Sequence, residues 1–86
     1  MYFRRQRVAV ACYDNSIRIY GKRDNYSSFI SLQGHTDIIN QIVCVDFNVI
    51  ASASDDKTVK VWNINSETVI AEFMSEKEVL SVAIFN

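Results

Sequence analysis

Short apolar segments alternate with polar turns along the whole chain. The apolar segments are rich in Val, Ile, Tyr and Phe, residue types that favour β-strands. Their lengths and spacing are typical of an all-β domain. Eight strands are predicted, at residues 7–12, 16–21, 27–32, 38–45, 49–54, 58–63, 67–73 and 79–85.

Two of these segments, 8–12 and 42–45, are apolar at consecutive positions instead of alternating. A strand of that kind needs cover on both faces of its sheet. The small residues at 51–54 would let neighbouring sheets approach closely. In the turns, Asp14-Asn15 and Asp55-Asp56 can hydrogen-bond their own backbone, and Gly34 permits a backbone conformation forbidden to other residues.

The chain repeats itself. Residues 14–20 recur as residues 56–62, an offset of 42 positions. A period of roughly 40 to 45 residues is typical of one propeller blade. Similarity at a fixed period indicates stacked units, each of which covers its apolar face against a neighbour.

Gly34-His35, the Ser-rich segment 52–54, Asp56 and the closing segment 58–63 follow one another at the spacing of a known repeat. The chain resembles the WD-repeat β-propeller family, with Asn63 in place of the usual Asp. The resemblance implies an all-β partial β-propeller made of antiparallel four-stranded blades. It implies the last three strands of one blade at 1–33, a complete blade at 34–73 and the first strand of a following blade at 74–86.

The same resemblance implies a buried hydrogen-bond network of His35, Ser52, Asp56 and Trp62. Donors and acceptors balance across it: the indole only donates, the hydroxyl and the neutral imidazole do both, and the carboxylate accepts. A Ser, His and Asp together also suggest nucleophilic hydrolysis. We reject that alternative because the hydroxyl would be engaged by the indole inside a blade, with no exposed nucleophile and no oxyanion donors. No catalytic residue is predicted, and the chain is not expected to be an enzyme.

Composition and charge further narrow the classes of protein to which the chain can belong. The 86 residues are 49% hydrophobic and 22% charged, a composition typical of globular proteins. The formal net charge of −1 is too small to favour nucleic acid or a membrane as partner. Arg4, Arg5 and Arg7 are interpreted as a solvated terminus and not as a phosphate-binding arm. The sequence contains no Gly-rich phosphate loop and no zinc-ligand spacing, so no cofactor or metal site is predicted.

No apolar run approaches the roughly 18 residues of a membrane span, and no secretory signal is recognisable, so a cytoplasmic or nuclear location is expected. Cys12 and Cys44 are therefore predicted to be buried free thiols, and not a disulfide or metal pair.

The aromatic residues are expected to be strand and core residues and not base-stacking platforms. They are Tyr2, Phe3, Tyr13, Tyr20, Tyr26, Phe29, Phe47, Phe73 and Phe85.

The family resemblance implies a non-catalytic scaffold that binds a protein or peptide partner. The candidate binding loops hold Asn15, Thr36, Asp37, Asp55 and Lys57, although these are also ordinary solvated turn residues. Two alternatives stay open. The chain could be a fragment of a larger propeller without independent activity, such as a ubiquitin-ligase substrate receptor, which the short turn at 46–48 suggests. It could also form a homo-oligomer, a trimer or tetramer, whose copies complete one ring.

Overall fold

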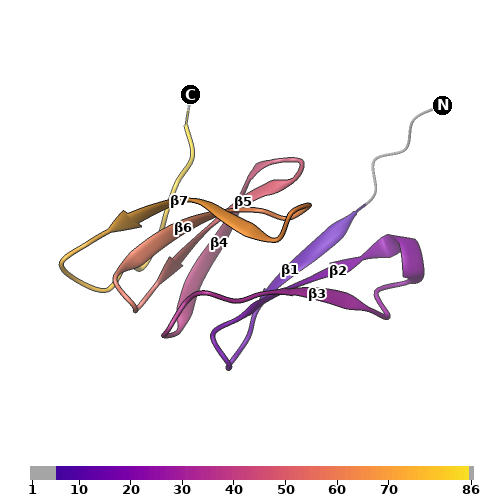
Figure 1. Cartoon of the computed structure of the whole chain (residues 1–86), viewed down its shortest axis with the longest axis horizontal. Helices are drawn as coiled ribbons and strands as arrows, with labels where there is room; N and C mark the ends of the chain where they lie inside the picture. The colour runs from indigo at the N-terminus through magenta and orange to yellow at the C-terminus, as the bar shows by residue number, and fades with distance from the viewer. Residues whose placement is uncertain (1–5, 86) are drawn as a thin grey trace.

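Residues 6–85 are described by a computed structural model, in which they form two antiparallel β-sheets (Figure 1). The first sheet has three strands in the order β1 (Arg7–Ala11), β2 (Ile17–Gly21) and β3 (Phe29–Leu32). A short 3-10 helix, η1 (Lys22–Asp24), connects β2 to β3. In this part of the chain no helix is both long enough and apolar enough to span a membrane.

The second sheet has four strands in sequence order, β4 (Ile39–Asp46), β5 (Val49–Ser54), β6 (Thr58–Asn63) and β7 (Thr68–Met74). Each strand pairs with the next one along the chain, as short turns require. The prediction of an all-β chain with a four-stranded antiparallel sheet is confirmed, and seven of the eight expected strands are present among the described residues.

The eighth expected strand, at residues 79–85, is wrong. The Val79 N–H donates to the Ser54 carbonyl at 3.0 Å, and the Val82 N–H donates to the Gln41 side chain at 2.6 Å. A strand needs a neighbour that satisfies its backbone groups in a repeating ladder. Residues 79–85 have only single contacts with Asn40, Gln41 and Ser54 and form no such ladder, so they lie beside the second sheet without joining it.

The two sheets share one hydrophobic core. Ile17, Ile19 and Leu32 come from the first sheet, and Ile39, Ile50, Trp62 and Ile64 come from the second sheet and its connections. All seven are at most 7% exposed. Each sheet therefore removes its apolar face from water against the other, which is the main source of stability for such a pair. All of β5 except Val49 is buried, and its Ala and Ser side chains leave room for this close approach.

Several burial predictions are wrong. Val8 and Val10 on β1 are 47% and 39% exposed. Arg7 and Ala9 face the second sheet, so Val8 and Val10 point to the opposite face of the first sheet, where they stay partly open to solvent. Both cysteines are free, but Cys12 is only half-buried and Cys44 is exposed. Most aromatic residues also lie outside the core: Tyr13, Tyr26, Phe29, Phe47, Phe73 and Phe85 are exposed. Tyr2 and Phe3 lie outside the described residues.

Arg7 was expected to be solvated, and the structure contradicts this. Its side chain is half-buried and reaches the turn between β4 and β5, where Nη1 donates to Asn48 Oδ1 at 3.1 Å and Nη2 donates to the Phe47 carbonyl. The guanidinium also lies 4.7 Å from the centre of the Phe47 ring. Arg7 therefore ties the first sheet to the second. Arg4 and Arg5 lie outside the described residues.

Arg7→Ala is expected to lower the free energy of unfolding by about 1 to 3 kcal/mol, because it removes two hydrogen bonds, a cation–π contact and the packing of the aliphatic stem. Chemical denaturation followed by circular dichroism measures this. Lys77→Ala, which truncates an exposed cation, serves as the control and should change stability by less than about 0.5 kcal/mol. Equal effects of the two variants would contradict a connection between the sheets through Arg7.

Candidate functional site

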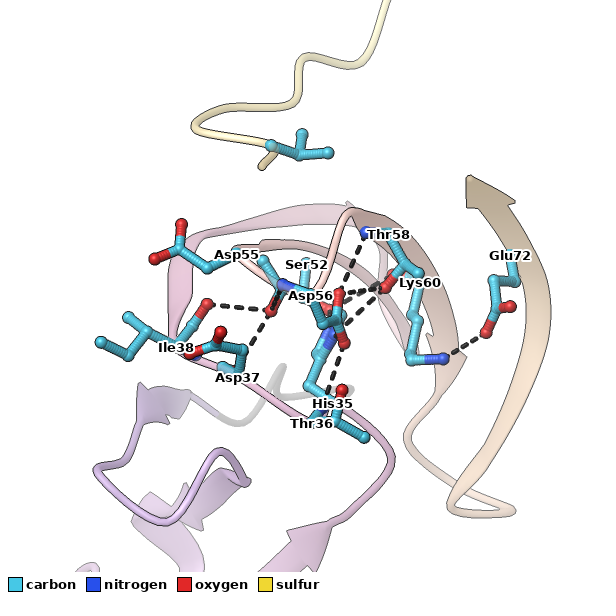
Figure 2. A network of polar contacts seen from close by, with 12 residues as sticks. His35, Thr36, Asp37, Ile38, Ser52, Asp55, Asp56, Thr58, Lys60 and Glu72 are labelled. Atoms are coloured by element: carbon cyan, nitrogen blue, oxygen red, sulfur yellow. Dashed lines mark hydrogen bonds and ion pairs between the residues drawn. The ribbon is translucent and has the colours of Figure 1, made fainter. Parts of the chain in front are cut away.

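Four polar side chains meet at one end of the second sheet. His35 lies on the connection between β3 and β4, Ser52 on β5, Asp56 in the turn between β5 and β6, and Trp62 on β6. The Trp62 indole N–H donates to Ser52 Oγ at 2.8 Å, Ser52 Oγ lies 2.6 Å from His35 Nε2, and His35 Nδ1 lies 2.8 Å from Asp56 Oδ2. Figure 2 shows the imidazole directed at the Asp56 carboxylate. The structure thus places the four residues singled out from the sequence in one continuous chain of contacts.

The direction of each hydrogen bond follows from the ends of this chain. The Asp56 carboxylate can only accept, so His35 donates its Nδ1–H and leaves Nε2 as an acceptor. The Ser52 hydroxyl then donates to Nε2 and accepts from the indole. For a neutral imidazole, this arrangement places the proton on Nδ1. Within residues 6–85 every buried polar side-chain atom has a partner, so the network is fully satisfied.

Asp56 is the most heavily bonded member. Besides His35, its carboxylate accepts from the Thr58 hydroxyl at 2.6 Å, the Thr58 amide at 3.0 Å and the Thr36 amide at 3.1 Å. Burial by itself would raise the pKa of Asp56, but the hydrogen bonds from Thr58, His35 and the Thr36 amide outweigh it and hold that pKa far below its usual range. The carboxylate therefore stays ionised although its side chain is only 6% exposed.

Thr58 and Ser54 belong to this site but were missed from the sequence. The Ser54 hydroxyl donates to the Ile38 carbonyl at 2.9 Å and accepts the Asp56 amide at 3.0 Å, so it joins the two connections that the network braces. The signal for Thr58 was available: an Asp two residues before a Thr is a common side-chain-to-backbone turn. Ser54 could not have been found, because its partner is a backbone carbonyl from a distant segment.

Lys60 was missed as well. It is only 9% exposed, and its ammonium pairs with Glu72 on β7 (Figure 2). Lys60 and Glu72 lie directly opposite each other in the β6 and β7 register. Alternation along β6 places Thr58, Lys60 and Trp62 on the same face, which the sequence does show. The register with β7 could not be read from the sequence, because a bulge interrupts it between Val61 and Trp62.

Gly34 is important for a different reason from the one expected. It does not have a positive φ, so it does not use the backbone freedom that glycine permits. Instead, a Cβ added at Gly34 would lie 3.0 Å from the Trp62 ring. A side chain at position 34 would thus crowd the indole that begins the network, unless the indole shifted slightly.

The first sheet contains only part of this arrangement. Asp14 Oδ1 accepts from the Ser16 hydroxyl at 2.5 Å and from the Ser16 amide at 3.1 Å, which repeats the contacts of Asp56 with Thr58. These hydrogen bonds from Ser16 lower the pKa of Asp14. Tyr20 stands where the other sheet has Trp62, and it contacts the Phe29 ring instead. The turn chemistry is repeated in both sheets, but the buried network occurs only in the second among the described residues.

The candidate binding residues lie on turns. Thr36, Asp37 and Asp55 surround Asp56 in Figure 2, whereas Asn15 lies on the turn between β1 and β2 of the other sheet. Asp55 accepts from the Asn40 amide at 2.8 Å, and Asp37 caps the amide of its neighbour Ile38. Asn15 and Lys57 both have positive φ, of 69° and 72°. Within residues 6–85 the side chains of Asn15, Thr36 and Lys57 have no hydrogen-bond partner, so they remain available.

The contacts among Ser52, His35 and Asp56 match those of a hydrolytic triad, but their surroundings do not. Ser52 is 0% exposed, and its oxygen already accepts from Trp62. Two grooves, of about 780 and 490 Å³, lie between the sheets, and neither is lined by any of the three residues. Among the described residues no group of three or more His, Cys, Asp or Glu side chains could hold a metal ion. The arrangement can order a turn and a connection, and it offers no path to a substrate.

Comparison with known proteins agrees with this geometry. Residues 26–63 match the family model described as WD domain, G-beta repeat. The chain is 32% identical over 79 residues to WD repeat-containing protein 37 of Xenopus laevis, covering 90% of this chain and 16% of that protein. It is 29% identical over 66 residues to WD repeat-containing protein RUP2 of Arabidopsis thaliana, covering 77% of this chain and 18% of that protein. The chain thus spans less than a fifth of the length of these curated relatives.

Ser52→Ala is expected to lower the free energy of unfolding by about 1 to 3 kcal/mol, because the indole N–H and the imidazole would both lose their buried partner. Denaturation followed by Trp62 fluorescence measures this loss. Ser81→Ala, at an exposed position, is the matched control and should have almost no effect. Unchanged stability of the Ser52 variant would show that the chain of contacts contributes nothing to folding.

Asp56 also predicts how stability depends on pH. Its pKa is lower in the folded state than in the unfolded state, where it is about 3.9. The stabilisation is therefore fully present above about pH 4 and is lost as the pH falls towards the folded-state pKa. Denaturation at a series of pH values should show that Asp56→Asn is less stable at pH 7 and falls less steeply below pH 4 than the wild type. Asp37→Asn, which alters an exposed carboxylate, should keep the wild-type slope, and an unchanged slope in Asp56→Asn would contradict the assignment.

Proposed function

Because this chain is a WD-repeat sequence, we propose that it is a non-catalytic scaffold that binds a protein or peptide partner. The partner would bind at the turns braced by the buried network, namely the connection before β4 and the turn between β5 and β6. Asn15 on the equivalent turn of the first sheet would extend this surface. The partner class comes from the repeat family, and the residues come from the geometry of the turns.

One observation carries the proposal. The same Asp56 carboxylate holds the Thr36 amide of one connection and the Thr58 amide of the other turn, so both are fixed in relation to each other. Their outward side chains, Thr36 and Lys57, remain without hydrogen-bond partners within residues 6–85. Turns that are already ordered lose little conformational entropy on binding, which favours affinity. Buried bracing and free outward groups together are what a binding rim requires.

A non-catalytic role is supported by the state of Ser52, whose hydroxyl is buried and engaged on both sides. Hydrolysis needs a nucleophile that reaches a substrate and donors that stabilise the oxyanion. Neither requirement fits a hydroxyl beneath Trp62. We therefore assign the network to stability and to turn geometry.

A second reading is that these repeats act as part of a larger propeller. Exposed apolar side chains on β1 and β7 favour it, since Val8, Ile70 and Phe73 are 47%, 55% and 59% exposed, and neighbouring blades would bury such faces. Those blades could come from the same polypeptide or from further copies in a trimer or tetramer. The narrower role of a ubiquitin-ligase substrate receptor stays a prediction, as does a cytoplasmic or nuclear location.

The rim is tested by affinity purification with the tagged chain and quantitative mass spectrometry of the retained proteins. Lys57→Glu should reduce the yield of at least one specifically retained protein by about fivefold or more, because reversing a rim charge changes association. Lys22→Glu makes the same charge change at an exposed position on η1, at the opposite end of β2 from the Asn15 turn, and is the control, which should retain that protein. Circular dichroism verifies that both variants fold. A retained set that is identical for the wild type and Lys57→Glu would count against the rim.

A further inference from the structure

A groove of about 780 Å³ separates the two sheets near η1, the turn between β4 and β5 and the connection after β6. Ile19, Ile30 and Ile64 supply apolar lining, and Phe29 and Phe47 lie beside them. Both aromatic rings are partly open to solvent, at 46% and 41% exposure. The volume lies within the range of about 300 to 1,000 Å³ that is typical of ligand sites. None of the candidate rim residues lines this groove.

The charges along the groove are unevenly paired. Lys22 and Arg23 on η1 are exposed and have no partner within residues 6–85. Arg7 is half-buried, and its hydrogen bonds go only to neutral oxygens of Asn48 and Phe47. The described residues give none of these three cations an ion pair. The groove therefore holds an excess of unneutralised positive charge beside an apolar floor.

The acidic residues of the lining do not remove this excess. The Asp24 carboxylate accepts from the Ser28 hydroxyl, and this hydrogen bond lowers the pKa of Asp24. Glu67 is the only other carboxylate in the lining, and it is exposed. Three cations thus line the groove with two anions, which leaves one positive charge in excess. Charge complementarity favours a ligand that brings carboxylates.

We propose that this groove binds a short peptide segment in which acidic residues flank an apolar side chain. The apolar side chain would enter between Ile19, Ile30 and Ile64, and the carboxylates would pair with Lys22 and Arg23. A polyanion such as a nucleic acid fits less well, because only a few cations are present and the net charge of the chain is −1. The groove and the rim share no residue, so each proposal can fail without the other.

The test uses the full chain and three fluorescein-labelled seven-residue peptides, followed by fluorescence anisotropy. The first is Gly-Asp-Leu-Asp-Phe-Glu-Gly. The second replaces its acids by the amides Asn and Gln, and the third replaces Leu and Phe by Ser. The first peptide should bind at least about tenfold more tightly than either of the others, because only it satisfies both the cations and the apolar floor. Equal affinities for the three peptides would overturn the proposal, as would no binding at about 1 mM.

Two variants locate the binding. The double variant Lys22→Glu with Arg23→Glu should lower the affinity for the first peptide by about tenfold or more, whereas Lys77→Glu should leave that affinity unchanged. Both positions in the double variant are exposed, so folding should be kept, and circular dichroism verifies this. Amide chemical shifts should change in residues 21–30 and 64–67 and not at 35–38 or 55–58. Equal weakening by the two variants, shift changes confined to the rim, or tighter binding of a labelled seven-nucleotide single-stranded DNA would each overturn the proposal.

Discussion

The ionised carboxylate of Asp56, buried at the end of the second sheet, is the interaction on which the local structure depends. A buried charge costs several kcal/mol unless it is fully hydrogen-bonded. Here the bonds come from two separate segments, namely His35 and Thr36 before β4 and Thr58 at the start of β6. Because the cost is offset only when all of these groups are in position, the carboxylate selects one arrangement of the connection before β4 and the turn after β5. The indole and hydroxyl extend this selection into the core through Trp62.

The contact between the sheets has a different character. Its centre is apolar and depends on the fit of Ile17, Ile19 and Leu32 against Ile50 and Trp62. At its edge Arg7 joins β1 to the β4–β5 turn through neutral oxygens and an aromatic ring. Apolar packing tolerates small shifts of one sheet along the other. The directional contacts of Arg7 restrict such shifts more strongly. The groove beside Arg7 is lined by residues of both sheets.

Much of the strand pattern could be read from the sequence, because β-branched residues and polar turns mark seven strands clearly. The positions of Gly34, His35, Ser52, Asp56 and Trp62 also indicated which side chains to examine. What failed were predictions that depended on neighbours. Residues 79–85 are as apolar as a strand and contact β4, but they form no backbone ladder with it. Cys44 has the pattern of a core residue but lines a groove between the sheets, where it stays exposed. Composition determines what a segment could do, whereas burial depends on which other segments are present.

The recognised repeat and the folded sheets are out of step by one strand. Residues 26–63 contain β3, which belongs to the first sheet, followed by β4, β5 and β6 of the second, and they leave out β7. The gain or loss of one such repeat unit during evolution would thus divide a sheet at each end of the unit. It would not add or remove a complete four-stranded sheet. The matched unit is thus interlocked with the preceding sheet, because it contributes β3 as a paired strand of that sheet. A tandem series built in this way can lengthen or shorten only if strands from different units pair anew at the junction.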